Sequence, residues 1–199
     1  MAGAPDQPAA APVPVREAAT VMLLRPGPQG FEVFLQRRVA SMAFAAGMTV
    51  FPGGARDQQD ADLRATAVRE VWEETGVRLD PGRLHPWARW VTPEDEPRRY
   101  DTLFFVAELP DAEEARATGT EMDHVTWMRP ADALAARARG ELGMWPPTFV
   151  TLRELAGCGD VNAVIRTAAQ RRLDPVLPER VEGPHGPAVQ LPDGEVVEL

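Results

Sequence analysis

The pattern of apolar and polar residues near the start of the chain predicts a β-hairpin. Residues 17–25 and 31–38 are rich in strand-forming side chains, and a Pro-Gly-Pro-Gln-Gly stretch at residues 26–30 separates them. A glycine- and proline-rich loop between two such runs is typical of two strands joined by a short connection. We therefore expect these two segments to pair.

The next segments predict a strand, a glycine loop and a helix. A short apolar run at residues 48–51 stops at Pro52-Gly53-Gly54, and apolar side chains then recur at helical spacing from about residue 61 to residue 75. Gly76 is well placed to end this helix, because glycine readily adopts the left-handed conformation that follows a helical C-terminus.

The rest of the chain alternates between strand and helix patterns. Further strands are expected at residues 84–91, 102–109 and 121–128, and helices at residues 131–139, 146–155 and 161–171. Residues 189–191 and 195–199 flank Pro192-Asp193-Gly194 and predict a terminal hairpin. This order of elements predicts an α+β fold, in which helices cover a mixed sheet as an α/β/α sandwich.

The length of 199 residues suits one domain with terminal extensions better than two full domains. We expect a flexible, Ala- and Pro-rich N-terminal tail at residues 1–15, a main folded domain at residues 16–173 that includes the C-terminal helices, and a C-terminal extension at residues 174–199. The chain shows neither a secretory signal nor a run of 18 apolar residues, so no membrane association is expected. The single Cys158 cannot form an internal disulfide, and the simplest location is a reducing cytoplasm.

The net charge of −9 disfavours binding to nucleic acid, because a negative field repels polyanions. All 21 basic residues are arginine, a bias that together with the abundance of alanine and proline indicates a GC-rich, bacterial coding sequence. A phosphate-bearing substrate would therefore need cations recruited locally.

Three glutamates share one face of the predicted acidic helix. Glu70, Glu73 and Glu74 stand three and four residues apart, and the stripe of apolar side chains that faces the other way consists of Ala65, Val68, Val71 and Trp72. Like charges at this spacing destabilise a helix by about 0.2–0.5 kcal/mol per pair. The last helical turn also carries partial negative charge. A divalent cation would remove both penalties, and carboxylate oxygens suit Mg²⁺ or Mn²⁺.

A solvated acidic face is the ordinary alternative for such a cluster, but two neighbouring features favour a metal site. Gly53 can bring its backbone carbonyl close to a metal because it has no side chain. Arg69 can orient Glu70 through a charge-assisted hydrogen bond. An ordinary surface helix needs neither feature.

Residues 54–77 resemble the Nudix box, a glycine followed by a glutamate and then by Arg-Glu-apolar-x-Glu-Glu-x-Gly-apolar. Residues 69–77 match this pattern at every fixed position. The spacing from Gly54 to Arg69 is one residue longer than in the family pattern, and Asp60 stands where the first glutamate is expected. The resemblance implies a Nudix-type sandwich and a Mg²⁺-dependent hydrolase of diphosphate linkages.

The resemblance also implies roles for particular residues. The expected metal ligands are Glu70, Glu73, Glu74 and the carbonyl of Gly53, and the expected catalytic residues are Arg69, Glu70, Glu73 and Glu121. Glu70 is either ligand or general base, and Glu121 is the candidate for a base or ligand from outside the box, with a solvated acid at a strand end as its alternative. The expected substrate-binding residues are Gly54, Arg37, Arg98 and Arg99.

Each arginine has a plain alternative as a surface charge, and one of Arg37 and Arg38 is expected to point outward on its strand. A guanidinium group binds phosphate bidentately, which favours these arginines as phosphate ligands. The aromatic residues Trp87, Trp90, Trp127 and Trp145 are expected in the core, rather than stacked on a nucleobase.

Motifs outside the box narrow the range of expected substrates. Residues 34–38, 50–54, 90–93 and 98–102 look like the branch of the family that includes acyl-coenzyme A diphosphatases. Coenzyme A or acyl-coenzyme A is therefore the favoured substrate, and ADP-ribose or a nucleotide sugar is the alternative. A non-catalytic, ligand-binding Nudix-like protein is disfavoured because all three helical glutamates are present. Dimers are common among relatives, so a homodimer is possible.

Overall fold

The computed structural model describes residues 13–39, 46–118 and 120–199. The predicted hairpin is confirmed. Strands β1 (Val15–Gly27) and β2 (Gly30–Arg38) pair antiparallel, and Gly27 faces Gly30 at the turn. Gly30 has a φ of 106°, and a Cβ there would lie 2.8 Å from the carbonyl oxygen of Gly159, so this turn requires glycine. Most of the predicted tail, residues 1–12, lies outside the described residues.

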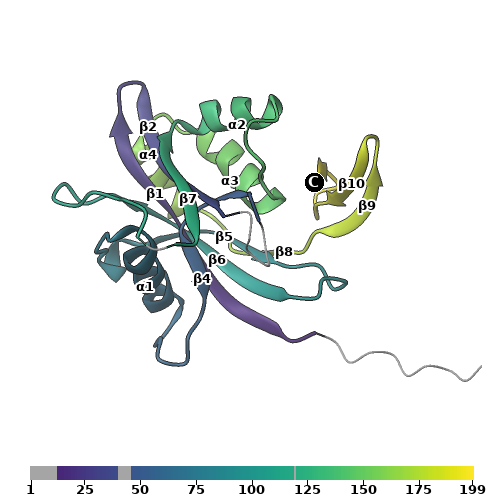
Figure 1. The fold of residues 1–199 in the computed structure, drawn as a ribbon, viewed down its shortest axis with the longest axis horizontal. Helices are drawn as coiled ribbons and strands as arrows, with labels where there is room; N and C mark the ends of the chain where they lie inside the picture. Colours follow the sequence, from purple (N-terminus) through teal and green to yellow (C-terminus); the bar gives the residue numbers. More distant parts are fainter. Residues whose placement is uncertain (1–12, 40–45, 119) are drawn as a thin grey trace, which may run out of the picture.

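A mixed sheet of eight strands forms the centre of the molecule (Figure 1). Its path runs β3-β2-β1-β6-β5-β8, with β4 paired to β1 and β7 paired to β2. The further strands are β3 (Thr49–Val50), β4 (Gly53–Ala55), β5 (His85–Val91), β6 (Arg99–Glu108), β7 (Met122–Met128) and β8 (Pro175–Val176). The β1–β6 and β5–β8 pairs are parallel and the others antiparallel, which confirms the predicted mixed sheet.

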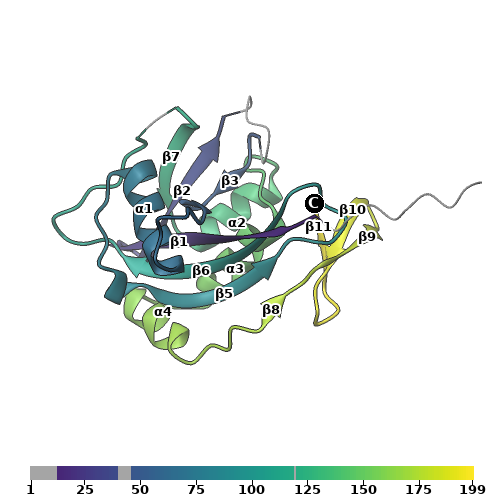
Figure 2. The same cartoon turned by 90° about the horizontal axis from the view of Figure 1, so that it is seen from below.

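Helices cover both faces of this sheet. Helix α1 (Leu63–Thr75) packs on one face, and α2 (Pro130–Ala138), α3 (Pro146–Ala156) and α4 (Val161–Ala168) pack on the other (Figures 1 and 2). A short 3-10 helix, η1 (Pro81–Arg83), precedes β5. The predicted α/β/α sandwich is therefore confirmed.

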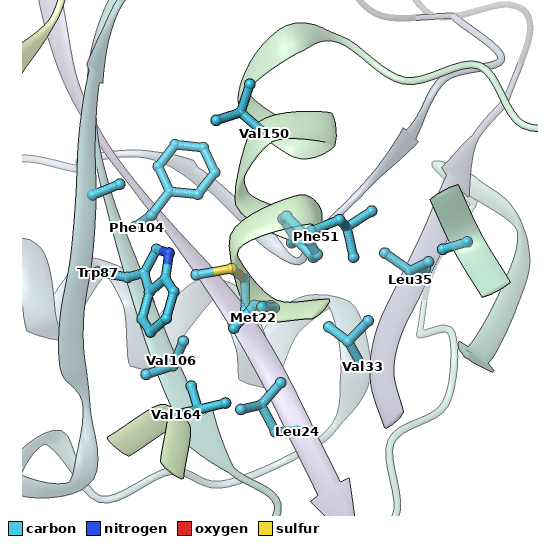
Figure 3. Close-up of a cluster of buried hydrophobic side chains, with 14 of the residues drawn as sticks. Met22, Leu24, Val33, Leu35, Phe51, Trp87, Phe104, Val106, Val150 and Val164 are labelled. Atoms are coloured by element: carbon cyan, nitrogen blue, oxygen red, sulfur yellow. The ribbon is translucent and has the colours of Figure 1, made fainter. Parts of the chain in front are cut away.

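The alternation of side chains along β1 divides the core into two layers. Val21 and Leu23 pack with Val71 of α1, whereas Met22 and Leu24 face the helices on the other side. The second layer is shown in Figure 3, where Trp87, Phe104 and Val106 meet Val150 and Val164 of the helices. Because both faces of β1 are buried, its apolar residues run almost continuously instead of alternating with polar ones.

Helix α1 begins and ends as the sequence predicts, but its buried face differs. The side chain of Asp62 accepts a hydrogen bond from the backbone nitrogen of Ala65, and Gly76 ends the helix with a φ of 74°. Trp72 is 51% exposed, so its assignment to the packed stripe is wrong. The stripe is displaced because Glu70 and Glu74 lie against β4 and β2, so these acids do not project away from the sheet as the sequence suggested.

The C-terminal segment forms a second, smaller sheet. The predicted hairpin is confirmed by β10 (Gly186–Gln190) and β11 (Val196–Glu198), and an unpredicted strand, β9 (Glu179–Gly183), pairs with β10. Val189, Leu191 and Val197 belong to the same buried cluster as Met22. The division of the chain at residue 174 stays a prediction. Within the described ranges, no helix has the length and apolar character needed to cross a membrane.

Candidate metal and diphosphate site

The two box glycines lie in strand β4, so the predicted glycine loop is corrected to a strand that pairs with β1. A Cβ on Gly53 would lie 2.4 Å from the carbonyl oxygen of Ala19, and one on Gly54 would lie 2.5 Å from the Oε1 atom of Glu70. Local propensity assigns Gly-Gly to a loop, whereas here the missing side chains let two strands and a glutamate approach one another closely.

Glu74 is the most enclosed of the helical glutamates. Its Oε2 atom accepts hydrogen bonds from the backbone nitrogen of Gly53 at 3.1 Å and from the side-chain nitrogen of Gln36 at 2.5 Å. Burial raises the pKa of Glu74 to about 7, although both hydrogen bonds act in the opposite direction. A nearby divalent cation would favour the charged carboxylate and so offset this desolvation.

Arg69 connects the two halves of the box. Its guanidinium donates to Asp60 at 2.9 Å, to Glu70 at 2.8 Å and to Glu73 at 3.1 Å. Asp60 is nearly buried, and the hydrogen bond from Arg69 holds its pKa well below its usual range. Burial raises the pKa of Glu70, and Arg69 opposes that rise. Arg69 therefore fixes the orientation of Glu70 and favours its charged form.

Four glutamates line one cavity of about 220 Å³, which we call the acidic cavity. Three of them lie on α1, and the fourth, Glu121, comes from a distant part of the chain. The described lining of the cavity consists of Glu70, Glu73, Glu74, Thr118, Thr120, Glu121 and Met122. Glu121 is largely exposed and lies 3.8 Å from the Nη2 atom of Arg38. The structure thus brings the candidate base from outside the box to the same cavity as the helical glutamates.

The segment before β7 docks on the C-terminal end of α1. The backbone nitrogen of Thr118 donates to the carbonyl of Glu74 at 3.0 Å, its hydroxyl donates to the carbonyl of Glu73, and the backbone nitrogen of Arg116 donates to the carbonyl of Thr75 at 3.1 Å. Helix C-termini leave such carbonyls without intrahelical partners. Sequence reasoning missed Thr118, and no sequence signal marks it.

The donor set fits a divalent cation, although the ligands are engaged with other partners. Among the described residues, no three acidic, histidine or cysteine side chains already surround one point as metal ligands. Arg69 binds Glu70 and Glu73, while Gly53 and Gln36 bind Glu74. Carboxylate oxygens are the donors that Mg²⁺ and Mn²⁺ prefer, and burial, which raises the pKa of Glu70 and Glu74, penalises their charged forms in a way that a bound cation would offset.

The predicted phosphate-binding arginines do not meet at the acidic cavity. Arg37 donates to Asp123 at 2.7 Å on the neighbouring strand. Arg98 is exposed, and Arg99 donates to the carbonyl of Thr92 at 3.3 Å. The substrate-binding roles of Arg37, Arg98 and Arg99 stay predictions. Arg38 is the more enclosed of the adjacent pair, and its Nε atom is buried without a hydrogen-bond partner among the described residues.

A second and larger cavity, of about 410 Å³, adjoins the acidic cavity. We call it the apolar cavity because Phe51, Trp90, Phe104 and Met144 line it. Gly53 and Arg38 also line it, and these residues contact Glu74 and Glu121 of the acidic cavity. A ligand that bridges the two cavities would therefore pass Gly53 and Arg38.

The four tryptophans that were expected in the core lie in the core, at the apolar cavity, or in both. Trp87 is fully buried and donates its indole hydrogen to Glu154 at 2.7 Å, and Trp127 packs edge-on against Phe34. These two are core residues as expected. Trp90 is 4% exposed and also belongs to the core cluster, as expected, and it lines the apolar cavity as well. Trp145 is partly exposed and lines the same cavity.

A family model described as NUDIX domain matches residues 14–149. The chain belongs to the NUDIX family. Enzymes of this family hydrolyse diphosphate bonds in nucleoside diphosphate derivatives and generally use divalent metal cations. The resemblance found in residues 54–77 is thereby confirmed.

The similar curated proteins are also Nudix hydrolases. A putative nudix hydrolase 7 of Caenorhabditis elegans is 25% identical over 64% of this chain and 57% of its own length. The human acyl-coenzyme A diphosphatase NUDT19 is 28% identical over 46% of this chain and 25% of its own length. An uncharacterized Nudix hydrolase NudL of Klebsiella aerogenes is 41% identical over 36% of this chain and 58% of its own length. The matches thus span less than two thirds of each of these relatives.

Solved structures show the same NUDIX fold. A NUDIX hydrolase from Alicyclobacillus acidocaldarius has a TM-score of 0.74 and 27% identity, over 83% of this chain and 100% of that one. The NUDIX domain of Shewanella oneidensis NrtR, solved with ADP ribose, has a TM-score of 0.53 and 19% identity, over 69% of this chain and 90% of that one. The second likeness concerns the fold alone.

Proposed function

We propose that this protein hydrolyses a diphosphate linkage in a nucleoside diphosphate derivative, and that coenzyme A or acyl-coenzyme A is its preferred substrate. The observation that carries the proposal is the meeting of Glu70, Glu73, Glu74 and Glu121 at one cavity, beside a larger apolar cavity. Membership of the NUDIX family supports the reaction type. The human relative named an acyl-coenzyme A diphosphatase supports the choice of substrate.

In this mechanism Glu70, Glu73 and Glu74, with the carbonyl of Gly53, would hold Mg²⁺ or Mn²⁺. When bound, the cation neutralises phosphoryl oxygens and lowers the pKa of water. The side chains themselves orient the reactants. Arg69 orients Glu70 and favours its charged form, and Glu121 or Glu70 would accept the proton of the attacking water. Arg38, at the border of the two cavities, faces the phosphates.

A substrate panel tests this proposal. The protein is incubated with Mg²⁺ and coenzyme A, acyl-coenzyme A, ADP-ribose, a nucleotide sugar or a dinucleoside polyphosphate, and products are separated by chromatography. We expect cleavage of the coenzyme A compounds, and a loss of at least about 100-fold in kcat for Glu74→Gln. The control is Glu182→Gln, which makes the same change at an exposed glutamate of β9.

Two results would contradict the proposal. Wild-type protein that binds a panel compound without releasing product would support the non-catalytic alternative. Equal activity of Glu74→Gln and wild type would show that the acidic cavity is not the catalytic site. Preferential cleavage of ADP-ribose or a nucleotide sugar would support the proposed reaction but contradict the proposed substrate.

A further inference from the structure

The C-terminal strands β9 to β11 lie beyond the residues that the family model matches, yet they are fixed to the rest of the molecule. The carbonyl of Glu198 accepts a hydrogen bond from Arg137 of α2 at 2.9 Å. Glu195 pairs with Arg153 of α3 at 2.6 Å. Figures 1 and 2 show these strands on the side of the molecule where the loop between β5 and β6 lies. The second sheet is therefore held against two helices by charged contacts.

A third attachment lies at the mouth of the apolar cavity. Arg180 of β9 binds Asp95 at 3.1 Å and also pairs with Glu96, both in the loop between β5 and β6. Glu96 and Arg180 line the cavity themselves. This ion-pair cluster connects the C-terminal strands to the loop between β5 and β6.

The C-terminal strands also supply part of the cavity wall. Pro178, Arg180, Val189 and Leu199 line the cavity on this side. Phe51, Trp90, Phe104 and Met144 line it from the main domain, and each of these four is buried. The buried part of this lining is thus apolar, and two of its charged residues, Glu96 and Arg180, are paired with each other.

This lining favours an aliphatic ligand group over a nucleobase. A nucleobase brings several hydrogen-bonding groups, and polar groups that lose water without finding partners are penalised. An aliphatic chain brings none and gains from leaving water. Gly53 and Arg38 line the apolar cavity and contact Glu74 and Glu121 of the acidic cavity, so such a chain would extend past them from a diphosphate held beside the helical glutamates.

We propose that the C-terminal strands complete the substrate cavity and select for an aliphatic group attached to the diphosphate substrate. The inference rests on the proposed hydrolysis and adds to it a function for residues 175–199. Leu199 and Arg180 are its specificity-determining residues. Leu199 contributes apolar surface, and Arg180 holds the wall against the loop through Asp95 and Glu96.

Two matched pairs of variants test whether the C-terminal strands form part of the substrate cavity. Leu199→Glu is compared with Leu177→Glu, since both leucines are exposed, 54% and 51%, but only Leu199 is among the described lining residues. Arg180→Glu is compared with Arg172→Glu, because Arg172 forms an exposed ion pair with Asp174 outside that lining. Rates are measured with octanoyl-coenzyme A and with coenzyme A.

We expect wild type to prefer octanoyl-coenzyme A by at least about tenfold in kcat/KM, because a few buried methylene groups suffice for this ratio. Leu199→Glu and Arg180→Glu are expected to lower kcat/KM for octanoyl-coenzyme A more than for coenzyme A, and so to abolish most of the preference. The two control variants should retain the preference. Equal effects of Leu199→Glu and Leu177→Glu would overturn the proposal.

Calorimetric binding in EDTA separates this inference from the proposed function. Without divalent cations, wild type should still bind octanoyl-coenzyme A more tightly than coenzyme A, and Leu199→Glu should lose the difference. If no substrate is hydrolysed but this binding pattern holds, the proposed reaction fails and the cavity assignment survives. If hydrolysis occurs but both compounds bind equally, the cavity assignment fails.

Discussion

Asp60 is the residue at which the sequence departs from the family pattern and the structure explains the departure. Its carboxylate accepts hydrogen bonds from Arg69, from the backbone nitrogen of Asp57 and from the hydroxyl of Thr66. Asp60 is one methylene shorter than the glutamate of the family pattern, and the chain has one more residue before Arg69. The carboxylate of Asp60 nevertheless contacts the guanidinium of Arg69. Because Arg69 in turn holds Glu70, Asp60 supports the site without lining its cavity.

Asp60→Asn is expected to reduce stability at neutral pH. The ionised carboxylate is buried, whereas its partner Arg69 is partly exposed, so we expect a loss of about 1.5–3 kcal/mol, the range for a hydrogen bond to a charged group, instead of the larger loss of a fully buried ion pair. The folded state lowers the pKa of Asp60, so its contribution is fully present above the unfolded value of 3.8 and is lost as the pH falls below that value. Urea unfolding at pH 7 and pH 3 measures both effects.

The control for this prediction is Asp174→Asn, which alters an exposed ion pair with Arg172. Exposed pairs contribute about 0–1 kcal/mol, so its effect should be small at either pH. If Asp60→Asn were no less stable than wild type at pH 7, the Asp60–Arg69 pair would have no structural role. A difference between the two proteins that persisted undiminished at pH 3 would contradict the assigned titration.

Among the secondary-structure elements, the contact between β4 and α1 positions the glutamates of the acidic cavity. Gly53 lies against β1, and Gly54 lies against the carboxylate of Glu70. At its other end, α1 is capped by hydrogen bonds from the segment that leads to β7, which positions Glu121 near the last helical turn. Three elements that are separated in sequence are therefore joined around the glutamates.

Gly54→Ala is expected to lower kcat by about 100-fold, because a displacement of about 1 Å in a catalytic group has an effect of this size. The added Cβ would overlap Glu70, 2.5 Å from its Oε1 atom, and force the carboxylate aside. Steady-state kinetics measure the loss, and circular dichroism checks the fold. Gly159→Ala is the matched control, since a Cβ there meets no atom within 4 Å. Unchanged kinetics for Gly54→Ala would show that Glu70 does not need this contact.

At the scale of the whole molecule, folding and cation binding should be linked. Glu70 and Glu74 are buried enough for their pKa values to rise, so the folded state without a cation bears a desolvation penalty. A ligand that binds only the folded state stabilises it by mass action, by about 2.7 kcal/mol at a concentration 100 times its Kd.

Mg²⁺ is therefore expected to raise the Tm of the wild-type protein and to raise that of Glu74→Gln much less. Differential scanning fluorimetry with MgCl₂ measures this shift, and NaCl at equal ionic strength is the control for screening. A Tm that responds equally to both salts would argue against a cation site at the acidic cavity. Equal shifts in wild type and Glu74→Gln would place the cation elsewhere.

The sequence by itself determined the features that depend on neighbours a few residues apart. The hairpin of β1 and β2 follows from two strand-forming runs around a glycine-rich turn, and α1 follows from Asp62, the helical spacing of its apolar residues and Gly76. The shared position of the three helical glutamates, and the resemblance to the Nudix box, follow from the same local spacing.

Only the tertiary structure decided which distant residues meet. It placed Glu121 beside the helical glutamates, turned the predicted glycine loop into strand β4, and left Trp72 exposed. It also paired Arg37 with Asp123, away from the described lining of the acidic cavity, and folded the C-terminal strands into the wall of the apolar cavity. Local patterns record propensity and periodicity, whereas these placements depend on side chains and strands packing over long sequence separations.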